Sequence, residues 1–150
     1  MLEKLHISEF TKSRPRRSND NALVESKNGA IVRGWLGRAH IPADHAPAVN
    51  GFLRDHLCPF LNFHRPCLFP SEVEGPRGRI KKRYRQQDVA TPYEKLKSLP
   101  DAENFLRDGV TFEQLDKTAA ATSGLHAAKA VRVARRQLFR DLADAGTSAA

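Results

Sequence analysis

The chain has 150 residues, of which 40% are hydrophobic and only 7% aromatic, and its formal net charge is +8. This length allows one modest domain with a thin, mostly aliphatic core, and the positive charge favours a polyanionic partner, above all nucleic acid. The sequence shows no secretion signal, and no run approaches the roughly twenty apolar residues of a membrane span, so we expect a cytoplasmic protein with no membrane partner.

The first part of the chain predicts a strand, a turn and a helix. Apolar residues alternate loosely over residues 5–10, which is typical of a short strand. Pro15 lacks a backbone donor and disfavours helix at the residue before it, so residues 13–18 should form a basic turn. A helix should follow over about residues 20–36, with Gly37 as its stop.

The middle of the chain predicts a second helix over about residues 46–63. Pro47 suits its first turn, whereas Pro59 falls inside its apolar pattern and should kink or interrupt it. Residues 63–70 are expected to form an irregular aromatic connection. Residues 72–87 are rich in charge and cannot build a core, so they should form an extended or mobile basic arm.

Local capping signals place the C-terminal helices. Thr91 is followed by Glu94, and Thr111 by Gln114, at the spacing of a capping box. A last helix should run from about residue 119 or residue 125 to residue 142. Its expected apolar face consists of Val131, Ala134, Leu138 and Leu142. Its expected basic face, which we interpret as solvated, consists of Lys129, Arg132, Arg136 and Arg140.

Two cysteines, Cys58 and Cys67, match no metal-binding spacing and form no disulfide framework. His56 and His64 lie nearby in the sequence, so a zinc site is conceivable. Packing of the second helix explains Cys58 without a metal. We therefore expect two ordinary reduced thiols.

The most informative carboxylate is Glu25, in the second turn of the first expected helix, with Lys27 and Asn28 beside it. An acid in basic surroundings suggests a group that holds a metal ion next to a polyanion. The alternative is a solvated acid near the positive end of a helix, which stabilises the helix by about 0.3–1 kcal/mol.

The residues around Glu25 resemble the segment that carries the third catalytic acid of integrase-type DDE transposases, the bacterial relatives of retroviral integrase. The resemblance lies in FTKSRP from residue 10, NDN from residue 19, VESKN from residue 24 and VR from residue 32. Further blocks are KKRY from residue 81 and TPYEKL from residue 91. The match covers roughly residues 7–97. Ser26 departs from it, because many relatives carry glutamine there.

The resemblance implies a mainly α chain with one or two short N-terminal strands. Residues 1–70 would be the C-terminal end of an RNase H-like core, with a strand, the helix of the catalytic glutamate and a following helix. Residues 71–150 would be a basic arm with short helices. The other two catalytic acids would lie upstream of Met1, so we expect an incomplete remnant that is inactive alone.

The resemblance also implies DNA strand cleavage and transfer with Mg²⁺, in which Glu25 is the catalytic and metal-binding acid. The partners would be the ends of a mobile element and its target DNA, together with the missing N-terminal half or a second copy. Ten cations are candidate DNA contacts: Arg14, Arg16, Arg17, Lys27, Arg33, Arg79, Lys81, Lys82, Arg83 and Arg85.

Two other functions remain open. The chain could be a non-enzymatic basic protein that binds DNA or RNA, with Glu25 incidental. It could also be a protein-interaction remnant whose last helix docks its apolar face on a partner.

Overall fold

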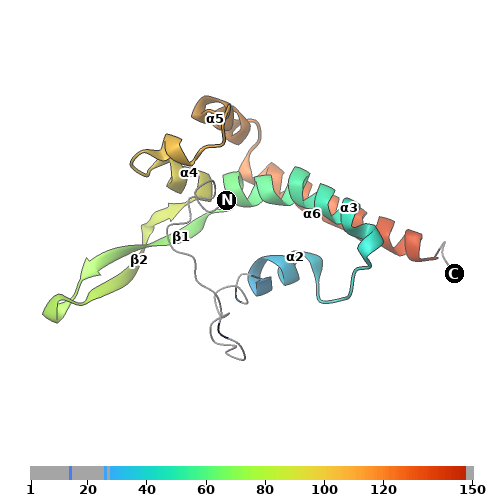
Figure 1. Ribbon diagram of the computed structural model, residues 1–150, viewed down its shortest axis with the longest axis horizontal. Coiled ribbons are helices and arrows are strands. Elements are labelled where there is room, and N and C mark those ends of the chain that lie inside the picture. Colours follow the sequence, from blue (N-terminus) through green and yellow to red (C-terminus); the bar gives the residue numbers. More distant parts are fainter. Residues whose placement is uncertain (1–13, 15–25, 27, 148–150) are drawn as a thin grey trace. The chain divides into compact units, whose positions relative to one another are not determined.

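The computed structural model describes residue 14, residue 26 and residues 28–147. The described part is mostly helical and contains one two-stranded antiparallel sheet, which confirms the expected mainly helical class (Figure 1). The strand expected at residues 5–10 lies outside the described residues, as does nearly all of the expected basic turn. The chain divides into two compact units, Met1–Ala43 and Asp44–Ala150.

In the first unit, the described residues form the end of a helix. Asn28–Arg33 has π-helical hydrogen bonding and continues into the short α2, Gly34–Leu36. Gly37 ends it with a φ of 81°, and its N–H donates to the carbonyl of Arg33 at 3.1 Å. Only glycine adopts this φ readily, so the expected stop at Gly37 is confirmed.

The second unit contains the long helix 46–64, made of α3 (Ala46–Phe52) and a continuation to His64. The continuation includes two stretches of π-helical bonding, Leu53–Leu57 and Phe60–His64. Pro59 was expected to kink or interrupt this helix, and it does not interrupt it: its backbone stays helical at φ −57° and ψ −46°, between the two π-helical stretches. The N–H of Cys58 bonds to the carbonyl five residues earlier, and such a wider turn accommodates a residue without a donor.

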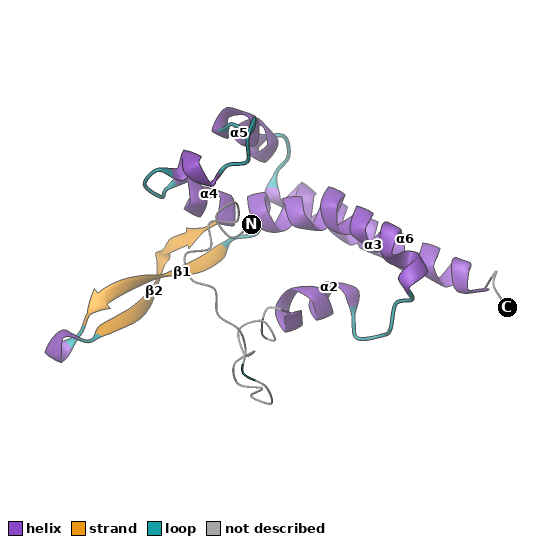
Figure 2. Ribbon diagram, in the orientation of Figure 1, coloured by secondary structure: helices purple, strands orange, loops and turns teal. Residues whose placement is uncertain are grey.

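Two strands, β1 (Cys67–Glu74) and β2 (Ile80–Ala90), pair antiparallel as a twisted ribbon (Figure 2). A short 3₁₀ turn, Pro76–Gly78, closes its tip. The irregular connection expected over residues 63–70 is therefore wrong from Cys67 onward. The expected arm is extended, but it is a paired hairpin whose backbone groups bond across the two strands.

Both predicted capping boxes are present. The hydroxyl of Thr91 accepts from the N–H of Glu94 at 3.2 Å and starts α4, Pro92–Lys97. In the same way Thr111 accepts from Gln114 at 3.3 Å and starts α5, Phe112–Ala120. Each box also has the reciprocal bond from the glutamate or glutamine back to the cap residue, which confirms the predicted helix starts.

The core of the second unit lies between helix 46–64 and the last helix α6, Gly124–Thr147. Leu57 and Val131 are each only 1% exposed, and Phe52 and Leu138 are 5% exposed. The predicted apolar face of the last helix is thus confirmed and is covered by the chain itself. Helices from both sides of the boundary expected near residue 70 share this core.

Candidate nucleic-acid interface

The residues of the expected catalytic segment are mostly outside the described part. Four of the predicted site residues are among those not described: Arg16, Arg17, Glu25 and Lys27. Their roles stay predictions. Arg14 and Arg33 are described and exposed. Among the residues that the structure describes, no three His, Cys, Asp or Glu side chains are grouped to hold a metal ion. None of the described helices is both long and apolar enough to cross a membrane.

The other five predicted DNA contacts gather on the ribbon. Lys81, Lys82, Arg83 and Arg85 belong to β2, and Arg79 precedes it at the tip. All five side chains are exposed. The antiparallel pairing of β2 with β1 therefore presents these five exposed cations on one two-stranded ribbon, which we call the basic ribbon.

The pleat distributes these cations over both faces of the ribbon. Successive residues of a strand point to opposite faces, so Lys81 and Arg83 share one face while Lys82 and Tyr84 share the other. On β1, Val73 and Ser71 pair with the first two, and Glu72 pairs with Lys82. Phosphates can consequently be contacted from either face.

Acidic neighbours do not neutralise the basic ribbon. Glu72 lies opposite Lys82 in the register, and Glu74 lies opposite Ile80. Nevertheless, within the described part of the chain no ion pair engages a lysine or arginine of the ribbon. These cations are therefore available to an external anion.

A bulge in β2 marks the base of the ribbon. The pairs Leu68–Val89 and Pro70–Tyr84 leave residues 85–88 opposite the single residue Phe69. The one hydrogen of the Ser71 hydroxyl can go to either of two acceptors, the Asp88 carboxylate at 3.1 Å or the Arg83 carbonyl at 3.2 Å. A bulge bends a strand and strengthens its twist, so this one sets the direction of the outer ribbon.

A small cavity of about 290 Å³ lies between the bulge and α4. Phe69, Ser71 and Asp88 line it from the ribbon, and Glu94 and Lys95 line it from the helix. The ammonium of Lys95 lies over the Phe69 ring, 5.9 Å from its centroid. These contacts join the base of the ribbon to α4.

Tyr93 fixes α4 in turn. The residue is 8% exposed, and its ring lies 5.1 Å from the ring of Phe63, centroid to centroid. Its hydroxyl donates to Asp116 on α5 at 2.7 Å, and Lys97 donates to the same carboxylate at 2.7 Å. Tyr93 therefore links α4, which directly follows the ribbon, to helix 46–64 and to α5. We call these three helices the support of the ribbon.

The protonation of this support follows from its geometry. Burial first, and then the hydrogen bond with Asp116, raise the pKa of Tyr93 to about 12. Hydrogen bonds from Lys97 and then from Tyr93 lower the pKa of Asp116 below its ordinary value. At neutral pH the phenol is protonated and the carboxylate is charged, which is the arrangement that their hydrogen bond requires.

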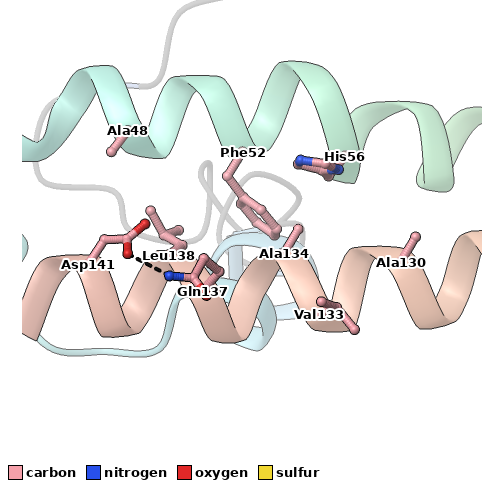
Figure 3. A pocket seen from close by; sticks show the side chains of 9 residues that line it. All are labelled: Ala48, Phe52, His56, Ala130, Val133, Ala134, Gln137, Leu138 and Asp141. Atoms are coloured by element: carbon pink, nitrogen blue, oxygen red, sulfur yellow. Dashed lines mark hydrogen bonds between the residues drawn. The ribbon is translucent and has the colours of Figure 1, made fainter.

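An apolar groove of about 620 Å³ runs between helix 46–64 and α6 (Figure 3). Phe52 and His56 line one side, and Ala134 and Gln137 line the other. Gln137 donates to Asp141 at 2.8 Å. The sequence pattern alone does not predict this groove. Most of its lining residues are apolar, so the groove is suited to packing apolar groups.

Comparisons with known proteins show a partial similarity. No family model matches the chain, and no solved structure matches it. A curated protein of Sinorhizobium fredii (strain NBRC 101917 / NGR234), the uncharacterized protein y4rM, is 40% identical to the chain over 76 residues. The aligned segment is 51% of this chain and 22% of the relative, so the chain matches a minor part of a longer protein.

Proposed function

We propose that this chain is a DNA-binding part of an integrase-type transposase and that the basic ribbon holds duplex DNA. The observation that carries the proposal is a two-stranded ribbon with unpaired cations on both faces. The major groove of B-DNA admits such a ribbon, and its walls carry phosphates on both sides. A ribbon that enters the groove contacts both walls at once.

The contacts of the basic ribbon are mainly with phosphates. Lysine and arginine side chains neutralise phosphates and release counterions, which makes binding strongly dependent on salt. Such contacts position a protein on DNA but read no sequence. Tyr84, 57% exposed and on the same face as Lys82, adds a flat apolar surface to the ribbon.

The proposal also includes metal-dependent strand transfer, and the resemblance around Glu25 supports this part. Glu25 would supply one of the carboxylates that hold two Mg²⁺ ions. One carboxylate cannot hold two ions, and the resemblance implies that the other two catalytic acids lie upstream of Met1. DNA binding by the ribbon requires none of these acids.

The DNA-binding part is tested by the salt dependence of duplex binding. The variant Lys81→Gln/Lys82→Gln/Arg83→Gln should lower the slope of log K against log salt by about 2–3 units, since each phosphate contact contributes about 0.9. Fluorescence anisotropy with a short labelled duplex measures this slope.

A charge-matched control removes three exposed cations elsewhere: Arg38→Gln, Arg107→Gln and Lys117→Gln. This control should change the slope by less than about one unit, because scattered cations contact few phosphates. Equal slopes for the ribbon variant and the control would show that the ribbon is not the interface. Absence of binding by the natural chain at low salt would refute DNA binding altogether.

The catalytic part has a separate test. The purified chain alone should neither nick nor join DNA with Mg²⁺ or Mn²⁺, for want of the other carboxylates. A gel assay with labelled duplex measures both reactions. Robust activity that Glu25→Gln abolishes would show that this chain assembles a complete site by itself.

The second candidate is a basic nucleic-acid-binding protein without strand-transfer chemistry. The basic ribbon supports this candidate as strongly as it supports the transposase, because phosphate binding needs no catalytic acid. A preference for RNA over duplex DNA in the same anisotropy assay would favour this candidate over the transposase.

A further inference from the structure

The last helix carries a second group of cations that the basic ribbon does not account for. Four side chains, three or four residues apart, lie on one flank of α6 and are exposed: Lys129, Arg132, Arg136 and Arg140. Residues at this spacing are neighbours along a helix surface. We call them the basic stripe.

The charges on α6 are segregated rather than mixed. No acidic residue occurs between Lys129 and Arg140, and the acids of α6 are Asp141 and Asp144. Among the described residues no ion pair engages the stripe. A helix face that only keeps a protein in solution more often alternates charges of opposite sign.

The packing of α6 limits how the stripe can meet DNA. A helix is about 10–12 Å across and fills a major groove about 12 Å wide. The opposite face of α6 is buried against helix 46–64, with Val131 and Leu138 in the contact. Only the exposed face of α6 can therefore approach DNA, and the long cationic side chains of the stripe on that face can reach backbone phosphates.

The length of the stripe fits several phosphates. From Lys129 to Arg140 the helix rises about 16 Å, at 1.5 Å per residue. Phosphates of one strand follow each other about every 3.4 Å along the duplex axis. The stripe thus spans several phosphates with four cations, which is enough for a sequence-independent contact.

The stripe and the basic ribbon belong to the same compact unit. A methyl group at Gly124, the first residue of α6, would lie 3.7 Å from the carbonyl oxygen of His64. His64 ends helix 46–64, and β1 begins at Cys67. The helix that carries the stripe therefore begins close to the base of the ribbon.

We infer that the basic stripe is a second DNA-backbone contact, which positions a duplex on α6 while the basic ribbon holds it. This inference rests on the proposed DNA binding and adds a second surface to it. In this inference the stripe contacts only phosphates, so its contribution to binding affinity is the same for every DNA sequence.

The test uses the full chain with the variant Arg132→Gln/Arg136→Gln/Arg140→Gln. Its slope of log K against log salt should fall by about 2–3 units for each of two duplexes of unrelated sequence. The charge-matched control at Arg38, Arg107 and Lys117 should stay within about one unit of the natural chain. Lysine at the three positions should restore the slope, because a backbone contact needs the charge and not the arginine fork.

The outcomes separate the two claims. If the ribbon variant loses slope and the stripe variant does not, the stripe inference is overturned and the proposed function stands. If lysine fails to restore the slope while circular dichroism shows a folded chain, contact by charge alone is overturned. If the natural chain binds no duplex at low salt, both claims fall.

Discussion

Tyr93 shows how a single residue determines where the basic ribbon is held. It lies on α4, directly after the ribbon, and its ring packs on Phe63 of helix 46–64. Its hydroxyl bonds to Asp116 of α5. One side chain therefore connects three helices, with an apolar contact at its ring and a charged hydrogen-bond partner at its tip.

Replacing Tyr93 with phenylalanine removes only the hydroxyl and so measures its contribution to stability. The variant keeps the ring contact and loses the bond to Asp116, so unfolding at neutral pH should cost about 1 kcal/mol less. Chemical denaturation followed by circular dichroism measures the change. A variant as stable as the natural chain would show that the bond does not secure α4.

The same substitution should change the response to alkali. The folded pKa of Tyr93, about 12, is above its ordinary value of 10.0, so the folded state favours the protonated phenol. Its contribution is complete below pH 10 and is lost as the pH rises toward 12, because the unfolded chain ionises first. The Tyr93→Phe variant should lack this loss of folding stability between pH 10 and pH 12. Identical stability curves for both proteins from pH 9 to 12 would contradict the raised pKa.

At the scale of elements, the helix pair of 46–64 and α6 supplies the core. Leu57 is 1% exposed, whereas Leu125, on the first turn of α6, is 66% exposed. The same residue type therefore occupies a packed and a solvated position in one unit. The stabilisation by packing can be measured with one substitution at each position.

Leu57→Ala should destabilise the chain by about 2–5 kcal/mol, because it leaves a cavity between the helices. The matched control Leu125→Ala should change the stability by no more than about 0.5 kcal/mol, because it removes an exposed side chain. Thermal unfolding measures both. Similar effects of the two substitutions would mean that the helix pair is not packed as described.

The elements also show which features the sequence predicts. The capping boxes at Thr91 and Thr111 were predictable because each depends on residues three positions apart. The hairpin was missed because its evidence is spread over both strands. Ile80 and every residue up to Gln87 are exposed, so β2 reads as a solvated arm and lacks the alternation that β1 shows from Cys67 to Glu74. Backbone pairing holds this ribbon, and composition does not reveal it.

At the scale of the whole chain, the sequence predicted the cations of the candidate interface but not their support. Lys81, Lys82 and Arg83 stand together in the sequence, so their clustering was visible. The contact of Tyr93 with Asp116 joins residues 23 positions apart, and neither residue belongs to a recognisable motif. The catalytic assignment of Glu25 lies outside the described residues and stays a prediction.

The most direct test of DNA binding by the ribbon is an NMR titration of the natural chain with a short duplex at low salt. We expect the backbone amide shifts to change most in β2 from Ile80 to Arg85 and at the ribbon tip, with a second set of changes along the outer flank of α6. The amides of α5 should change little. Changes confined to α5 or to the groove beside Phe52, with the ribbon amides unmoved, would contradict DNA binding by the ribbon.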